Sequence, residues 1–296
     1  MINPLHLLRT QAHPLHRLRR LKGFQAVSRH FDPIVKRQPS HLPRPIHLRL
    51  VSHASLLMDG ATQEASVLGT FVEVLYALHS EDRLVFWDVG ANIGGYSWKC
   101  AALRPMATIV SFEPDAKNLE CLHRTSRAWR LSQHAIVPAA VADVSGRAVF
   151  CPDDITGTTG TLQVDSPTFN AIHYGRISKT IEVETISLDD FVQQSDPPSI
   201  IKVDVEGAEM RVLRGAVGLL NRYLPVLLIE TFEHRDEVIA FLKRFGYEIY
   251  DSDRRERCNG SSTNMVAFVR ERHPSVVEAL SRFGYPVGDQ KQSTHS

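Results

Sequence analysis

The chain alternates between short apolar runs and longer stretches in which apolar residues recur at the 3.6-residue spacing of a helix. Each run ends at an acidic, polar or glycine-containing segment, which is typical of a buried parallel strand followed by a turn. This alternation predicts an α/β fold with helices on both faces of a mostly parallel sheet. The five predicted parallel strands are residues 84–89, 107–112, 135–143, 199–207 and 225–231.

Helical spacing is clearest in two segments of the second half. Residues 208–221 place apolar side chains on one face, and residues 235–245 do the same before Gly246, a natural helix stop. Two short apolar runs after Gly246 predict a terminal antiparallel hairpin. The remaining predicted elements are a strand at about 47–58, a helix at about 64–78, hairpin strands at 247–250 and 264–269, and a short helix at about 275–283.

The first predicted strand opens directly into a turn with two glycines, in the sequence D-V-G-A-N-I-G-G-Y-S at 88–97. Gly90 and Gly94 let the backbone pass close to a ligand without a Cβ in the way. Open α/β sheets bind ligands at the carboxyl ends of their strands. A second acid, Glu113, follows the second strand, where it could accept hydrogen bonds from two ribose hydroxyls. We therefore expect a nucleoside-containing cofactor rather than a turn that only joins a strand to a helix.

Three cofactor classes fit a glycine turn, and the residues around it separate them. A P-loop needs Gly-Lys-Ser/Thr at its end, which Gly94-Gly95-Tyr96 does not provide. A dinucleotide site favours G-x-G-x-x-G, but here Asn92 replaces the middle glycine. Asp88 before the turn would repel a diphosphate, whereas it suits a ligand with a sulfonium and an α-ammonium group. These residues favour S-adenosyl-L-methionine (SAM) over a dinucleotide.

Several motifs give the chain a resemblance to the FkbM family of SAM-dependent methyltransferases over about residues 85–270. The motifs are W-D-V-G-A-N-I-G-G-Y-S at 87–97, S-F-E-P-D at 111–115, A-D-V-S-G at 142–146, I-S-L-D-D-F at 186–191, I-I-K-V-D-V-E-G-A-E-M-R-V-L-R-G-A at 200–216 and V-L-L-I-E at 226–230. The K-V-D-V-E-G-A-E block is the most specific of them. The resemblance implies a class I (Rossmann-like) methyltransferase, with a doubly wound, seven-stranded, mostly parallel sheet and a terminal antiparallel hairpin.

The resemblance also implies roles for individual residues. Members of the family transfer the SAM methyl group to oxygen, often on a sugar or a polyketide-type product. Glu113 would hold the ribose, Asp143 or the backbone near it would face the adenine, and Asp204 and Glu206 would lie at the reaction side. The residues expected around the methionine end are Asp88, Gly90, Asn92 and Gly94, with Tyr96 in the same cofactor-binding set.

An alcohol acceptor is helped by a general base within hydrogen-bond reach. Asp204, Glu206, Glu230 and His234 are the candidates, because each lies at or just beyond the carboxyl end of a predicted strand. Glu206 has an alternative role as an acid at a helix start, and His234 could be an exposed loop residue. A divalent metal on Asp204, Glu206 and Glu230 would also activate a hydroxyl. Nothing in the spacing requires a metal, so we predict none.

Acceptor specificity is expected in the insertion at 151–180. The segment contains the small hydroxylated residues of 156–161, followed by Phe169, His173 and Tyr174. These residue types suit sugar binding, but they suit an ordinary loop equally well. The sequence does not decide between the two.

The formal net charge of +1 conceals a basic N-terminal arm. Residues 1–50 carry ten Lys or Arg and a single acid, Asp32. We expect a partly flexible arm, with contact to an acidic partner or an anionic membrane surface as alternatives. The predicted organisation is this arm, a lead-in strand and helix at 51–84, the methyltransferase domain at 85–270, and a short helix and disordered tail at 271–296. The sequence does not indicate the oligomeric state.

No apolar run is long enough to cross a bilayer, and charges interrupt the N-terminus too often for a signal peptide. The four cysteines form no C-x-x-C pair. We therefore expect reduced thiols in a cytoplasmic protein.

The predicted function is SAM-dependent O-methylation of a hydroxyl on a sugar, glycan or related natural-product acceptor. One alternative, suggested by the basic arm, is a nucleic-acid methyltransferase. The Asp204-Val205-Glu206-Gly207 segment opposes it, since enzymes that methylate base amino groups typically carry Asn/Asp-Pro-Pro-aromatic at this point. The other alternative is a non-catalytic binding protein on the same fold, for which calorimetry would detect no SAM binding.

Overall fold

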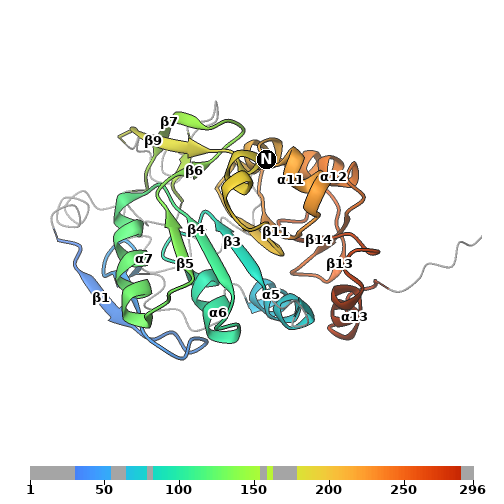
Figure 1. The fold of residues 1–296 in the computed structure, drawn as a ribbon, viewed down its shortest axis with the longest axis horizontal. Helices are drawn as coiled ribbons and strands as arrows, with labels where there is room; N and C mark the ends of the chain where they lie inside the picture. Colours follow the sequence, from blue (N-terminus) through green and yellow to red (C-terminus); the bar gives the residue numbers. More distant parts are fainter. Residues whose placement is uncertain (1–30, 55–64, 79–82, 154–158, 163–178, 288–296) are drawn as a thin grey trace, which may run out of the picture.

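The computed structural model describes residues 31–54, 65–78, 83–153, 159–162 and 179–287. An eight-stranded sheet forms its centre, in the order β13-β12-β14-β11-β10-β3-β4-β5 (Figure 1). In chain order these strands are β3 (Val85–Val89), β4 (Thr108–Phe112), β5 (His134–Val137), β10 (Ile200–Val203), β11 (Val226–Glu230), β12 (Glu248–Asp251), β13 (Glu256–Arg257) and β14 (Asn264–Phe268).

The strand directions confirm the predicted class I fold. β10 is parallel to β3 and β11, and β4 is parallel to β3 and β5. β14 lies antiparallel between β11 and β12, which gives the predicted terminal hairpin. The two-residue β13 adds an eighth strand at the edge of the predicted seven.

Helices cover both faces of this sheet, as Figure 1 shows. Because side chains alternate along a strand, Phe86 belongs to the core under one face and Trp87 to the core under the other. The first face is covered by α5 (Ala65–Ala77), α6 (Gly95–Leu103), α7 (Ala116–Trp129) and α13 (Pro274–Arg282). The second face is covered by α9 (Leu188–Phe191), the 3-10 turn η2 (Val192–Gln194), α10 (Glu209–Arg214), α11 (Val217–Tyr223) and α12 (Arg235–Lys243).

The predicted third strand, 135–143, is wrong in its extent. The structure divides it into β5, which ends at Val137, and β6 (Ala140–Val141), which belongs to a different sheet. Pro138 between them has no N–H to donate to a neighbouring strand. The Ala139 N–H then bonds the Val137 carbonyl at 2.9 Å, so the backbone turns out of the main sheet.

The predicted helix at 208–221 is two helices, α10 and α11. Gly215 lies at the break, where a Cβ would come within 2.1 Å of the Ala142 carbonyl oxygen. This close approach packs the break against the segment that leaves β6. The apolar stripe still faces the core, since Val212, Leu213 and Leu220 are buried under the second face.

A four-stranded sheet stands beside the carboxyl ends of the main strands, in the order β6-β9-β7-β8. Its further strands are β7 (Gly146–Cys151), β8 (Thr161–Leu162) and β9 (Ile181–Ile186). Phe150 and Leu162 pack with Ala208 at the start of α10, which anchors this small sheet to the main domain. The predicted insertion at 151–180 therefore contributes to a sheet, although Phe169, His173 and Tyr174 lie outside the described residues.

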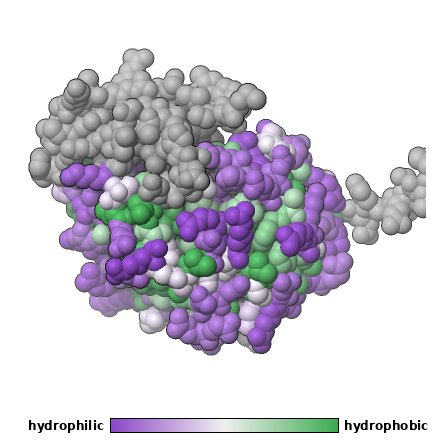
Figure 2. All heavy atoms as spheres, turned by 90° about the horizontal axis from the view of Figure 1, so that it is seen from above, coloured by the Kyte–Doolittle hydropathy of each residue, from purple (hydrophilic) through white to green (hydrophobic). Residues whose placement is uncertain are grey.

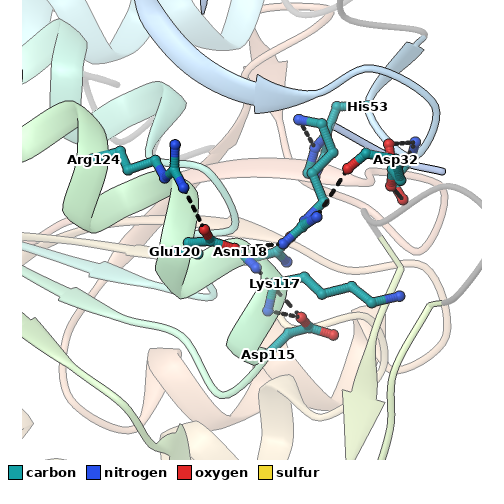
Figure 3. A network of polar contacts seen from close by, with 9 residues as sticks. Asp32, His53, Asp115, Lys117, Asn118, Glu120 and Arg124 are labelled. Atoms are coloured by element: carbon teal, nitrogen blue, oxygen red, sulfur yellow. Dashed lines mark hydrogen bonds and ion pairs between the residues drawn. The ribbon is translucent and has the colours of Figure 1, made fainter. Parts of the chain in front are cut away.

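The described part of the basic arm is folded against α7. β1 (Ile34–Arg37) and β2 (Ile46–Arg49) pair antiparallel as a separate sheet. Arg49 donates to Glu120 of α7 at 2.7 Å, and Glu120 also accepts a hydrogen bond from Arg124 at 2.8 Å (Figure 3). β2 starts at Ile46 and ends at Arg49, so the predicted strand at 47–58 starts one residue late and is too long. Asp32 accepts the Val51 N–H at 2.7 Å and fixes a turn immediately after β2.

Other predicted elements agree with the structure. α5, α12 and α13 lie where helices were expected, and all four cysteines are free thiols. Hydrophilic residues predominate on the face shown in Figure 2, with hydrophobic residues in small separate groups among them. None of the described helices combines the length and the apolar composition needed to cross a bilayer.

Candidate functional site

A cavity that opens to solvent lies at the carboxyl ends of β3, β4 and β10, under the small sheet. The residues that line it are Gly90, Asn92, Phe112, Glu113, Pro114, Asp115, Asn118, Ala139, Ala140, Val141, Phe150, Asp153, Gly160, Leu162, Asp204, Val205, Glu206 and Ala208. Five of these described residues are acidic and none is Lys or Arg.

The turn after β3 forms the floor of the cavity. Gly90 has a φ of 78°, and a Cβ on it would lie 1.8 Å from the Asp204 carbonyl oxygen. Gly94, with a φ of 88°, is packed so closely that a Cβ would meet the Trp98 ring at 2.6 Å. Both glycines are therefore required by close approach as well as by conformation. Gly90 and Asn92 line the cavity, whereas Gly94 supports the turn from behind.

Glu113 follows β4 and is only 5% exposed. Its carboxylate accepts the Asn92 N–H at 2.7 Å and the Asp115 N–H at 2.8 Å. The side chain thereby ties the glycine turn to the start of α7, whose N-cap is Asp115. Burial raises the pKa of Glu113 to about 7, although the two backbone donors act in the opposite direction. The carboxyl group is thus poised to exchange a proton near neutral pH.

Asp88 lies behind the turn and is not among the residues that line the cavity. It is on the same face of β3 as Phe86, so its side chain points toward α6, where Ser97 donates through its N–H at 3.1 Å and its hydroxyl at 2.6 Å. Burial raises the pKa of Asp88 to about 6, against the effect of these hydrogen bonds. A further 2.7 Å contact joins Ser97 to Ser111 of β4. Asp88 therefore fixes α6 against the sheet from beneath the glycine turn.

Asp204 and Glu206 follow β10 and both line the cavity. Glu206 has a φ of 50° and Gly207 a φ of 97°, so two successive residues adopt the left-handed conformation. For a non-glycine residue this costs on the order of 1–3 kcal/mol. Burial, and then the negative charges of Asp204 and Glu230, raise the pKa of Glu206 well above its usual value. A strained turn thus holds an acid in the cavity among like charges.

The alternative role considered for Glu206, an acid at a helix start, falls instead to Glu209. Glu209 is the first residue of α10 and accepts the Gly207 N–H at 2.8 Å. Its other oxygen accepts the Thr231 hydroxyl at 3.3 Å. Glu209 is 1% exposed and thus holds the strained turn from inside the protein.

Lys202, two residues before Asp204, was not selected from the sequence. Its Nζ lies 3.2 Å from Asp204 Oδ2 and 3.9 Å from Glu230 Oε2, and its side chain is 1% exposed. Nζ also lies 5.2 Å from the centre of the Tyr96 ring. The signal that could have identified it is a lysine inside an otherwise apolar strand.

Besides Asp88 and Gly94, three predicted site residues are absent from the cavity lining, namely Tyr96, Asp143 and His234. Asp143 is paired with Arg211 of α10 at 2.9 Å, and the interaction with this guanidinium lowers its pKa against the opposing effect of burial. Its neighbours Ala139, Ala140 and Val141 form the cavity wall instead. The His234 side chain is 39% exposed, precedes α12, and lies 3.5 Å from Glu237.

The segment that follows β7 contributes an acid, Asp153, that was not predicted from the sequence. Asp153 lines the cavity, is 5% exposed and accepts the Thr159 hydroxyl at 2.8 Å. Phe150 and Leu162 add apolar walls beside it. Across the described ranges, no group of three His, Cys, Asp or Glu side chains has an arrangement that could hold a metal ion.

Comparison with known proteins gives one family and two relatives. Residues 88–249, more than half of the chain, match the model of the methyltransferase FkbM domain. The chain is 28% identical over 146 residues to hexuronic acid methyltransferase AglP of Haloferax volcanii, covering 48% of this chain and 54% of that protein. It is 26% identical over 172 residues to 2-O-methyltransferase NoeI of Sinorhizobium fredii, covering 55% of this chain and 70% of that protein.

Among solved structures, a methyltransferase FkbM from Methylobacillus flagellatus KT aligns with 19% identity and a TM-score of 0.42. The alignment covers 66% of this chain and 47% of that one. The chain thus spans about half the length of AglP and of this solved structure.

Proposed function

The chain belongs to the FkbM family of methyltransferases, and from this premise we propose that it transfers a methyl group from SAM to a hydroxyl of a sugar or related acceptor. The observation that carries the proposal is one cavity that joins the Gly90 turn, the Glu113 carboxyl and the Asp204 carboxyl. The Gly90 turn and Glu113 suit a nucleoside cofactor, and Asp204 is a carboxylate that could deprotonate an acceptor. The sugar acceptor is inferred from the similarity to AglP, a hexuronic acid methyltransferase, and to NoeI, a 2-O-methyltransferase.

The residues of the cavity suit SAM in chemical character. SAM carries a sulfonium and an ammonium group, and the described lining residues include five acids but no Lys or Arg. Phe112, Ala139 and Val141 provide an apolar wall for a purine, and Glu113 can accept hydrogen bonds from ribose hydroxyls. Gly90 and Asn92 leave the backbone of the floor open to the methionine end.

Methyl transfer requires alignment of the acceptor oxygen and removal of its proton. SAM, when bound, supplies an activated methyl carbon with a thioether leaving group. The Asp204 carboxylate accepts the acceptor O–H proton as the oxygen forms its bond to carbon. Phe150 and Leu162 of the small sheet exclude water from the same space.

The acidic lining also bears on the nucleic-acid alternative. Proteins that bind nucleic acids neutralise phosphates with Lys and Arg. Among the described lining residues there is no Lys or Arg to do so. The geometry therefore favours an uncharged hydroxyl acceptor over a polynucleotide.

The test combines binding and transfer. Titration calorimetry with SAM and S-adenosylhomocysteine measures whether the cavity binds the cofactor. Transfer of a radiolabelled methyl group is then measured with methyl glycosides of hexoses, deoxyhexoses and hexuronic acids, and with tRNA and DNA. Binding together with label in a glycoside supports the proposal. Label only in nucleic acid, or no SAM binding, would refute it.

A further inference from the structure

The ammonium group of Lys202 lies inside the protein at the site rather than on the surface. Among the described residues, Lys202 is the only Lys or Arg that is buried. It is in β10, beside Asp88 of β3 and Leu228 of β11 in the parallel register. Removing an ammonium group from water costs several kcal/mol unless its charge is compensated. A leucine or methionine would fill this position without that cost, so the charge itself requires an explanation.

The charge is compensated on the side of the cavity. Lys202 Nζ is 3.2 Å from the carboxylate of Asp204 and 3.9 Å from that of Glu230. Lys202 is in β10 and Asp204 directly follows the last residue of this strand, so the backbone keeps the two side chains close together. The closer partner, Asp204, lines the cavity. The lysine therefore acts on the carboxylate that can reach an acceptor.

Aromatic rings restrict the movement of the lysine. The Tyr96 ring centre is 5.2 Å from Nζ, within the distance of a cation–π contact. Tyr96 in turn packs edge-on against Phe71 at 5.2 Å, and Phe71 lies 5.1 Å from Phe86 in the core. These rings extend from the core to Lys202, so the ammonium has little freedom to leave Asp204.

We propose that Lys202 is a positioning residue for methyl transfer, which holds the Asp204 carboxylate in one orientation, aimed into the cavity. This inference rests on the function proposed above. In the step that it serves, the acceptor O–H bond breaks and its proton goes to Asp204. The oxygen forms a bond to the methyl carbon, the carbon–sulfur bond breaks, and its electron pair stays on sulfur as a neutral thioether. Lys202 keeps its protons throughout.

Three variants of the full chain test the proposal. Lys202→Met removes the charge, Lys202→Arg keeps it, and Lys243→Met on the exposed end of α12 is the control for loss of a lysine. Circular dichroism and thermal unfolding establish that each variant is folded. Calorimetry with SAM establishes whether cofactor binding is retained. Turnover is then measured with the best methyl glycoside of the panel.

Lys202→Met is expected to bind SAM within a few-fold of the wild type and to lower kcat on the order of 10²-fold. The KM for the glycoside should change by no more than a few-fold, because Lys202 does not line the cavity, so the loss falls on kcat. Lys202→Arg should recover part of the rate. A purely structural role would lower stability but leave the kcat of the folded protein unchanged.

A second readout does not depend on turnover. Carboxyl ¹³C NMR of protein labelled at aspartate, with the Asp204 signal assigned by its loss in Asp204→Asn, reports the surroundings of this group directly. At one neutral pH that signal should shift or broaden in Lys202→Met, because the carboxylate loses the ammonium group 3.2 Å away that fixes it, and should stay unchanged in Lys243→Met. An unchanged signal, or unchanged kcat in Lys202→Met, overturns the inference. A wild-type protein that binds SAM but methylates no glycoside refutes the proposed function instead, and the NMR result still decides the role of Lys202.

Discussion

The buried carboxyl group of Glu113 should make both stability and cofactor binding depend on pH, and Glu113→Gln should remove that dependence. Glu113 has a folded-state pKa of about 7, against 4.5 for an exposed glutamate. A raised pKa means that the stabilising contribution is complete below about pH 4.5 and is lost as the pH rises through about 7. The protonated form therefore suits the folded protein, and ionisation acts against it.

The size of this effect follows from the pKa difference. One pKa unit corresponds to about 1.4 kcal/mol. The difference between 4.5 and about 7 therefore corresponds to about 3 kcal/mol of unfolding free energy lost between acidic and slightly alkaline pH. Glutamine has one acceptor oxygen for the two backbone donors of Asn92 and Asp115, which lowers stability by about 1–3 kcal/mol at every pH. This offset does not change the slope.

Urea unfolding at a series of pH values from 4.5 to 8 measures the slope. The free energy of unfolding of Glu113→Gln minus that of the wild type should increase by about 3 kcal/mol across this range. Glu278→Gln is a matched control, because the side chain of Glu278 is 72% exposed on α13. Parallel pH curves for wild type and Glu113→Gln would refute the reasoning.

Cofactor binding gives the second half of the same prediction. Ribose hydroxyls favour the ionised carboxylate, so SAM should bind the wild type more tightly as the pH rises toward 7. Glu113→Gln should lose this trend and weaken SAM binding by about 1–3 kcal/mol at pH 8, as measured by calorimetry. Unchanged affinity would remove Glu113 from the cofactor site.

Three further predictions concern the turns around the cavity. Gly90→Ala should abolish SAM binding and lower the melting temperature, because the new Cβ would lie 1.8 Å from the Asp204 carbonyl oxygen. The control is Gly95→Ala, whose Cβ would meet no atom within 4 Å and which should bind SAM normally. In urea unfolding, Glu206→Gln should be more stable than the wild type at pH 8 but not at pH 4. The reason is that the raised folded-state pKa of Glu206 lowers the stability of the wild type only as the pH rises. A difference in unfolding free energy that is the same at both pH values would contradict this. Asp204→Asn should retain SAM binding and slow transfer on the order of 10²-fold, whereas His234→Ala should keep the wild-type rate. The reason is that, of these two residues, Asp204 lines the cavity and His234 does not. The reverse result in the glycoside assay would make His234 the base.

Most of the sheet could be predicted from the sequence because buried parallel strands are continuous apolar runs, and turns follow them. The same logic brought Gly90, Glu113 and Asp204 to one cavity, since the carboxyl ends of parallel strands meet at one edge. The course of the chain after β5 could not be predicted in the same way. The apolar run continues past Pro138 into β6, and only the missing N–H marks the change of sheet.

Side-chain direction explains where the site prediction and the structure diverge. Asp88 occupies a strand end like Asp204, but it alternates with Val89 and points toward Ser97 of α6. Lys202 was hidden for the converse reason, since it lies within an apolar strand and its partners, Glu230 and Tyr96, come from distant segments. Asp153 depends on the fold of an insertion whose sequence has no periodic pattern.

The exit of the chain from the main sheet at Pro138 has an evolutionary consequence. Beyond β6, the residues Phe150 of β7, Asp153 of the segment after it, and Leu162 of β8 reach the cavity from outside the eight-stranded sheet. The length and composition of this part of the chain can therefore change without a change in the strands that carry the Gly90 turn and Glu113. Under the proposed function, acceptor choice could then change through this part of the chain alone, while the residues proposed to bind SAM stay the same.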